Sequence, residues 1–158
     1  MSAAGNIGTR IPWPPLLYLA AIAAGVLLHE VYPMPWIGQP LSDILFAFGL
    51  LVLAGGVALF AAAIATMRRA KTAIDPRKAP DHLVTGGPFT ISRNPIYLAD
   101  TLIVIGLGLV FQVAWLVVAA LVAALLTTRL AIVPEEKVLA ERFGKRYRDY
   151  ARRIRRWI

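Results

Sequence analysis

Long runs of apolar residues dominate the sequence, and short polar segments separate them. The runs over residues 13–31 and 44–67 are each close to the roughly 20 residues with which a helix crosses a bilayer. A third apolar run, over residues 96–133, is too long for one crossing, and Gln112 lies near its middle, preceded by two glycines. We therefore predict a turn at Gln112 and a hairpin of two shortish membrane helices.

The last part of the chain has a different pattern, in which single apolar residues recur every three to four positions. From Glu135 onward, lysines and arginines fill many of the positions between them. This period places the apolar side chains on one face of a helix. The apolar set is Leu139, Phe143, Tyr147, Tyr150 and Ile154. We predict an amphipathic helix in the headgroup region, with its cations toward anionic lipid.

Together these patterns predict an all-α integral membrane protein with about four transmembrane helices, organised as a single domain over residues 1–158. Two N-terminal spans occupy residues 1–67, and a cytoplasmic loop follows over residues 68–95. The helical hairpin covers residues 96–133, and the cytoplasmic amphipathic helix covers residues 134–158. Glycines in the second span favour close helix packing, either within the bundle or between subunits, so the oligomeric state is left open.

Composition agrees with a membrane protein and argues against a metal site. Of the 158 residues, 58% are hydrophobic, and the mean hydropathy is +0.65. The chain has no cysteine, which excludes a disulfide framework and a thiolate site. It has two histidines, too few for a metal cluster built on imidazoles, so we expect no bound metal.

The net charge of +8 is distributed in a way that predicts the topology. One lysine or arginine precedes the first span, six lie in residues 68–93, and ten lie from Arg129 onward. With four spans and both termini in the cytoplasm, every cation lies on the cytoplasmic side, as the positive-inside rule requires. We therefore expect a multi-pass protein of the inner (cytoplasmic) membrane, and the charge requires no nucleic-acid partner.

Three polar motifs lie on the cytoplasmic side of this topology. The first two are LVTGGPF at 83–89 and RNPIY at 93–97, both within the loop over residues 82–97, HLVTGGPFTISRNPIY. The third is the Pro-Glu-Glu sequence at 134–136, followed by FGKRY at 143–147. In the loop, the Gly-Gly-Pro sequence at 86–88 predicts a tight turn whose backbone groups can approach a ligand closely.

Each motif also has a purely structural interpretation. Pro95 suits the first position of a helix and disfavours helical geometry at Asn94, so Asn94 can cap that helix. Pro134, followed by two glutamates, likewise suits the start of a helix, where the helix dipole favours acidic side chains. The convergence of three motifs on one membrane face favours a functional site.

The order LVTGGPF, RNPIY, a hydrophobic hairpin, EE and FGKRY resembles that of the integral-membrane methyltransferases. This group comprises the isoprenylcysteine carboxyl methyltransferases and the related phospholipid N-methyltransferases, and the resemblance covers residues 82–157. It implies S-adenosylmethionine-dependent methyl transfer to a lipophilic acceptor that enters from the bilayer. An isoprenylcysteine-like carboxylate acceptor, a phospholipid amine acceptor and a non-catalytic membrane scaffold are the alternatives, and no residue pattern identifies the acceptor.

By position, the resemblance assigns a set of residues to cofactor binding. Leu83, Val84 and Phe89 would line the cofactor through backbone and ring contacts. A carboxylate at Glu135 suits a cationic sulfonium donor that also carries an ammonium group and ribose hydroxyls. The set is His82, Leu83, Val84, Gly87, Phe89, Arg93, Asn94, Pro95, Tyr97 and Glu135.

Two residues depart from the family pattern. Asn94 stands where the family has a histidine, and Phe89 stands where tyrosine is common. Asparagine can form hydrogen bonds but cannot act as a base near neutral pH. We expect the cofactor site to survive both changes and base catalysis by that histidine to be absent.

Two charged residues of the hairpin are the catalytic candidates, Asp100 and Arg129. A carboxylate acceptor needs no base, whereas an amine or phenol does, and Asp100 is the acidic candidate within the membrane. The alternative for Asp100 is an ion pair with Arg93 or Arg129. Arg129 would either pair with an acidic acceptor or anchor its helix.

Overall fold

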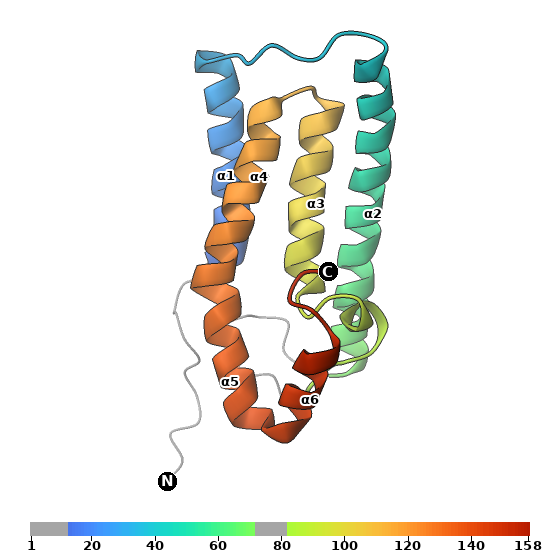
Figure 1. Cartoon of the computed structure of the whole chain (residues 1–158), viewed down its shortest axis with the longest axis vertical. Helices are drawn as coiled ribbons and strands as arrows, with labels where there is room; N and C mark the ends of the chain where they lie inside the picture. The colour runs from blue at the N-terminus through green and yellow to red at the C-terminus, as the bar shows by residue number, and fades with distance from the viewer. Residues whose placement is uncertain (1–12, 72–81) are drawn as a thin grey trace.

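Long helices run side by side along the molecule, as Figure 1 shows. The computed structural model describes residues 13–71 and 82–158, and these contain helices and turns but no strand. Helix α1 spans Trp13–Val31, and helix α2 spans Leu41–Arg69. The first predicted span is confirmed, and the second, over 44–67, is confirmed with an extra helical turn or less at each end.

The predicted hairpin is also confirmed. Helix α3 spans Pro95–Val110 and helix α4 spans Ala114–Thr127, with the turn between them where it was expected. Gln112 adopts a left-handed backbone conformation with φ 59°. This conformation reverses the chain between the two arms, and their close approach is possible because Gly108 lies against Val117 of α4.

Three helices in the described residues are long and apolar enough to cross a membrane: Pro14–Val31, Leu41–Arg69 and Ala114–Phe143. Helix α3 is equally apolar but has 16 residues. At a rise of 1.5 Å per residue it is about 24 Å long, somewhat short of the roughly 30 Å hydrocarbon core. The protein is therefore a multi-pass integral membrane protein in which α3 is the short arm of the hairpin.

Small residues bring α2 and α3 together along most of their length. Gly49 and Gly56 of α2 face α3, and a methyl group at Gly106 of α3 would lie 2.8 Å from the backbone of Leu53. Gly55 has no such neighbour. Within the described residues, two of the three glycines of the second span therefore serve packing inside the bundle.

The remaining contacts place α1 and α2 on opposite sides of the hairpin. Helix α1 packs mainly on α4, α2 packs mainly on α3, and α3 and α4 pack on each other. The buried side chains between α1, α3 and α4 include Tyr18, Val104 and Leu116. Because α1 and α2 have few contacts with each other, α3 is left partly uncovered between them.

One prediction about the C-terminal segment is confirmed in its position: Pro134 lies in the first turn of helix α5, Val133–Phe143, and Glu135 and Glu136 follow it there. The start of α5 is not a free helix end, because the backbone stays helical from α4 through a π-helical turn, Thr128–Ile132, into α5. In the π turn the Val133 N–H donates to the Thr128 carbonyl, five residues earlier. This shift of the hydrogen-bond ladder accommodates Pro134, which has no N–H to contribute.

The amphipathic segment also differs from the prediction, because it forms two helices instead of one. Gly144, with φ 54°, ends α5 and allows the chain to turn into helix α6, Lys145–Arg153. Figure 1 shows α6 and the C-terminal tail, residues 154–158, folding back toward the bundle. Its apolar face is covered by protein, since Tyr147 is buried, and several of its cations are exposed.

Candidate functional site

The loop that follows residue 81 lies at the same end of the bundle as α5 and α6 (Figure 1). A short 3₁₀ turn, Gly87–Thr90, forms the predicted tight turn. Gly87 has φ 60°, and its Cα lies so close to α2 that an added methyl group would be 2.9 Å from the Thr66 hydroxyl. Gly86 and Gly87 are exposed, so the backbone here is accessible as the sequence predicted.

Tyr97 and Glu135 form the central polar contact. Tyr97 lies in the first turn of α3 and Glu135 in the first turn of α5, and the Tyr97 hydroxyl donates to Glu135 Oε1 at 2.7 Å. Both side chains are only partly exposed. Among the described residues, no lysine or arginine forms an ion pair with Glu135, so its carboxylate faces a neutral phenol.

The adjacent glutamate, Glu136, is instead paired with cations. Arg156 binds Glu136 in a bidentate manner, with Nε 3.0 Å from Oε1 and Nη2 2.7 Å from Oε2. Arg93 Nη2 lies 3.2 Å from the same Oε1. The hydrogen bonds to Glu136 raise the pKa of Arg156. Two cations, Arg93 and Arg156, thus neutralise Glu136. No role was assigned to Glu136 from the sequence, and Arg156 lies outside the three motifs.

The C-terminal tail is hydrogen-bonded to the loop through main-chain carbonyls of the tail. The Arg93 N–H donates to the Arg155 carbonyl at 3.0 Å, and the Ser92 hydroxyl donates to the Arg156 carbonyl at 3.2 Å. Asn94 Nδ2 donates to the same Arg156 carbonyl at 3.0 Å. The residues just before α3 therefore hold the tail in place.

Asn94 occupies the N-cap position of α3, but its side chain does not cap the helix. The predicted N-cap position is confirmed, but the side-chain capping bond is absent because the amide donates to the tail. The Asn94 N–H donates to the Ser92 hydroxyl oxygen at 3.1 Å. Pro95 lies at the first position of α3, as predicted, and is buried.

Two tyrosines of α6 reach the same region. The Tyr150 hydroxyl donates to the Phe89 carbonyl at 2.6 Å, and burial raises the pKa of Tyr150 to about 12. Arg93 Nη1 donates to the Tyr147 hydroxyl oxygen at 3.3 Å. Burial raises the pKa of Tyr147, and the nearby Arg93 guanidinium opposes that rise.

The structure thus brings several predicted cofactor residues to one place. Tyr97 contacts Glu135 directly, Phe89 accepts a hydrogen bond from Tyr150 of α6, and Arg93 and Asn94 bind carbonyls of the tail. Of the remaining predicted residues, Pro95 begins α3, and the others precede the turn or form it. Leu83 and Val84 are partly buried, whereas His82 and Gly87 are exposed.

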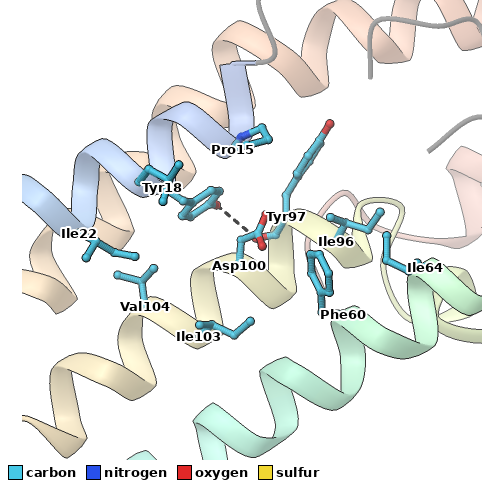
Figure 2. A pocket seen from close by; sticks show the side chains of 11 residues that line it. Pro15, Tyr18, Ile22, Phe60, Ile64, Ile96, Tyr97, Asp100, Ile103 and Val104 are labelled. Atoms are coloured by element: carbon cyan, nitrogen blue, oxygen red, sulfur yellow. Dashed lines mark hydrogen bonds between the residues drawn. The ribbon is translucent and has the colours of Figure 1, made fainter. Parts of the chain in front are cut away.

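An apolar groove opens on the other side of Tyr97. It has a volume of about 590 Å³ and is lined by residues of α1, α2 and α3, with Asp100 near its centre (Figure 2). The Tyr18 hydroxyl lies 2.6 Å from Thr101 Oγ1 and donates to the Tyr97 carbonyl at 3.2 Å. The Tyr97 side chain lines this groove and carries its hydroxyl away from Asp100, toward Glu135.

The two catalytic candidates are not brought together. Asp100 lines the groove, whereas Arg129 lies in the π turn after α4 with an exposed side chain. Arg93 pairs with Glu136 instead of Asp100. Neither alternative partner proposed for Asp100 therefore pairs with it in the described part of the chain.

The motifs and this geometry agree with the comparison to known families. The family model described as phospholipid methyltransferase matches residues 44–146, which is more than half of the chain. The chain belongs to this family. The match includes α3, the hairpin, Tyr97 and Glu135, so the family resemblance seen in the motifs is confirmed. A search of curated protein sequences found no match.

A solved structure shows the same fold. It is the eukaryotic intramembrane Ras methyltransferase, an isoprenylcysteine carboxyl methyltransferase, and it matches with a TM-score of 0.63 at 23% sequence identity. The match covers 95% of this chain and 53% of that protein. The chain therefore spans about half the length of that relative, and the likeness concerns the arrangement of the helices.

Proposed function

We propose that this protein is an S-adenosylmethionine-dependent methyltransferase that acts on a lipophilic acceptor drawn from the bilayer. One observation carries the proposal: Tyr97 lines the apolar groove and at the same time donates a hydrogen bond to Glu135. A residue shared in this way connects a polar site at the membrane surface with an apolar site between the helices. Methyl transfer between a polar donor and a lipophilic acceptor needs such an adjacency.

The chemistry of Glu135 fits the cofactor. Its partly buried carboxylate has a phenol as its hydrogen-bond donor and no ion-pair partner among the described residues. A buried carboxylate is stabilised by a cation, and the cofactor carries both a sulfonium and an ammonium group. Glu136 does not offer this opportunity, because Arg93 and Arg156 already neutralise it.

The other groups that would hold the cofactor come from the loop and the start of α3. Exposed backbone at Gly87, the side chains of Leu83, Val84 and Phe89, and the polar residues His82, Arg93 and Asn94 are the proposed contacts, together with Pro95, Tyr97 and Glu135. When bound, the cofactor supplies an electrophilic methyl group on a positively charged sulfur.

The contribution of the chain to catalysis is then mainly positioning and exclusion of water. Tyr97 fixes one oxygen of Glu135 and leaves the other available. The groove would hold the acceptor in apolar surroundings, and alignment of two reactants can lower a barrier by several kcal/mol, on the order of 7 or more in favourable cases. The tail, bound to residues 92–94 and to Glu136, would keep the loop in place.

Calorimetric titration of the detergent-purified protein with S-adenosylhomocysteine tests this proposal. Micromolar binding by the wild type and at least a tenfold loss in Glu135→Gln and Glu135→Ala are expected, because the cation-binding carboxylate is removed. Glu141→Gln is the matched control, since Glu141 is an exposed acid on the same helix. This control should bind as the wild type does.

The same titration distinguishes the catalytic and scaffold alternatives. Absence of binding by a folded, monodisperse wild-type protein would contradict the methyltransferase proposal and favour a membrane scaffold that keeps the fold. Equal losses in Glu135→Gln and Glu141→Gln would show that general charge, and not Glu135, determines affinity.

A further inference from the structure

Arg156 of the tail contacts both of the helix starts that form the candidate site. Its carbonyl accepts a hydrogen bond from Asn94 Nδ2 at 3.0 Å, directly before α3. Its guanidinium binds Glu136 in the first turn of α5, at 3.0 Å and 2.7 Å. The hydrogen bond between Tyr97 and Glu135 joins the same two helices. Two separate connections therefore hold the start of α3 beside the start of α5.

Glu136 is the residue through which the tail reaches the cofactor site. It follows Glu135 directly, and the two glutamates share the first turn of α5. The Glu136 side chain is only 17% exposed and also binds Arg93 Nη2 of the loop at 3.2 Å. A bidentate contact between a guanidinium and a carboxylate restricts orientation as well as distance. Because one helical turn connects the two glutamates, a shift of Glu136 also moves Glu135.

The docking of the tail depends on a small number of contacts. The tail has no regular secondary structure of its own, so other elements determine its position. Besides the contacts of Arg156, the Arg93 N–H donates to the Arg155 carbonyl at 3.0 Å. Trp157 Nε1 donates to Thr128 Oγ1 in the π turn before α5, at 3.2 Å. Segments held in this way open at a lower free energy than packed helices do, so the tail can detach while the bundle stays folded.

We propose that Arg156 is a positioning residue for Glu135 and that docking of the tail is coupled to cofactor binding. The docked tail fixes the two helix starts at the separation that suits the cofactor. The bound cofactor in turn favours the docked tail, because coupling between two binding events is reciprocal. Detachment of the tail lowers the affinity, which allows the demethylated cofactor to leave after transfer.

This inference rests on the proposed methyltransferase function and adds a means of regulating the same site. The family model matches residues 44–146, so Arg156 lies beyond the matched region. The Arg156 side chain is 38% exposed, whereas its partner Glu136 is largely buried. The cation is therefore the partner that can move into water, and the carboxylate stays with α5.

Calorimetric titration of the full-length protein in detergent with S-adenosylhomocysteine gives the first test. Arg156→Gln removes the charge and the bidentate contact, so it should bind at least about fivefold more weakly than the wild type. Arg156→Lys keeps the charge and should lie between the two. Arg155→Gln is the matched control and should bind as the wild type does, because the Arg155 side chain is exposed and its carbonyl makes the contact.

A second measurement separates positioning from a general loss of stability. Of the four tryptophans in the chain, Trp157 lies in the tail. In protein labelled with 5-fluorotryptophan, its ¹⁹F resonance is assigned with Trp157→Phe and reports the contact with Thr128. In Arg156→Gln this resonance should move away from its wild-type position, and saturating S-adenosylhomocysteine should bring it back. A purely structural role of Arg156 predicts a resonance that does not respond to the ligand.

Two results would overturn the inference alone. They are wild-type affinity in Arg156→Gln, and a displaced Trp157 resonance that saturating S-adenosylhomocysteine leaves unchanged. Absence of binding by the folded wild type would instead contradict the proposed function, and the inference with it. If the Arg156→Gln protein does not fold, the same two measurements on Arg156→Lys decide between these outcomes.

Discussion

Tyr97 and Glu135 lie 38 positions apart in the sequence, and the hydroxyl of the first lies 2.7 Å from a carboxylate oxygen of the second. This contact joins the start of α3, the first arm of the hairpin, to the start of α5, the helix that continues the second arm. It also joins the proposed cofactor site to the groove, because Tyr97 lines the groove. The two sites therefore cannot be altered independently at Tyr97.

Removal of the Tyr97 hydroxyl should weaken cofactor binding without unfolding the protein. A hydrogen bond to a charged group contributes about 1.5–3 kcal/mol, so Tyr97→Phe is expected to reduce affinity for S-adenosylhomocysteine by roughly tenfold or more. Tyr32→Phe is a control, since Tyr32 is an exposed tyrosine after α1. Unchanged affinity in Tyr97→Phe, measured by calorimetry, would mean that the phenol does not orient Glu135.

The tail should detach when the bidentate contact between Arg156 and Glu136 is lost. Lysine cannot reproduce the two parallel hydrogen bonds of a guanidinium, so Arg156→Lys should destabilise the docked tail by about 1–2 kcal/mol. Trypsin cleavage in the tail should become several times faster. Arg155→Lys is the matched control, because the side chain of Arg155 is exposed and its carbonyl makes the contact. Equal cleavage rates in the two variants would refute the proposed role of Arg156.

The sequence was sufficient to predict the membrane helices but not the position of the tail. Continuous apolar runs and the break at Gln112 predict α1 to α4 because a bilayer demands long apolar helices. The fold-back at Gly144 depends on a single positive φ, which helical periodicity does not reveal. Without that turn, nothing in the sequence indicates that Arg156 would reach Glu136 or that the Asn94 amide would bind the tail.

Prediction from the sequence was also incomplete at the candidate site. The family resemblance assigned Glu135 to the cofactor, but it could not distinguish Glu135 from Glu136 by environment. Only the structure shows that two arginines neutralise one glutamate while a phenol contacts the other. Likewise, Asp100 was an acidic residue in an apolar run, and its position in a groove between α1 and α2 required the packing of three helices.

Close packing between α2 and α3 should be sensitive to a single methyl group. Gly106→Ala would place Cβ 2.8 Å from the backbone of Leu53, so we expect a destabilisation of about 1–3 kcal/mol, measured by thermal or denaturant unfolding in detergent. Gly55→Ala, in the facing helix but without a neighbour within 4 Å, should be neutral or slightly stabilising. A Gly106→Ala protein as stable as the wild type would contradict the closeness of the two helices.

The hydrogen bond from Tyr150 to the Phe89 carbonyl should break at high pH, which weakens the docking of α6 on the loop. Burial raises the pKa of Tyr150 to about 12, above the value of about 10 expected in an unfolded chain. The neutral, donating form is therefore favoured in the folded state, so the contribution of this contact to stability is complete below pH 10. It is lost as the pH rises through about 12. The difference between the tyrosinate absorbance titrations of the wild type and Tyr150→Phe should have its midpoint near pH 12. A midpoint near pH 10 would show that Tyr150 is exposed and that its hydroxyl does not hold the loop.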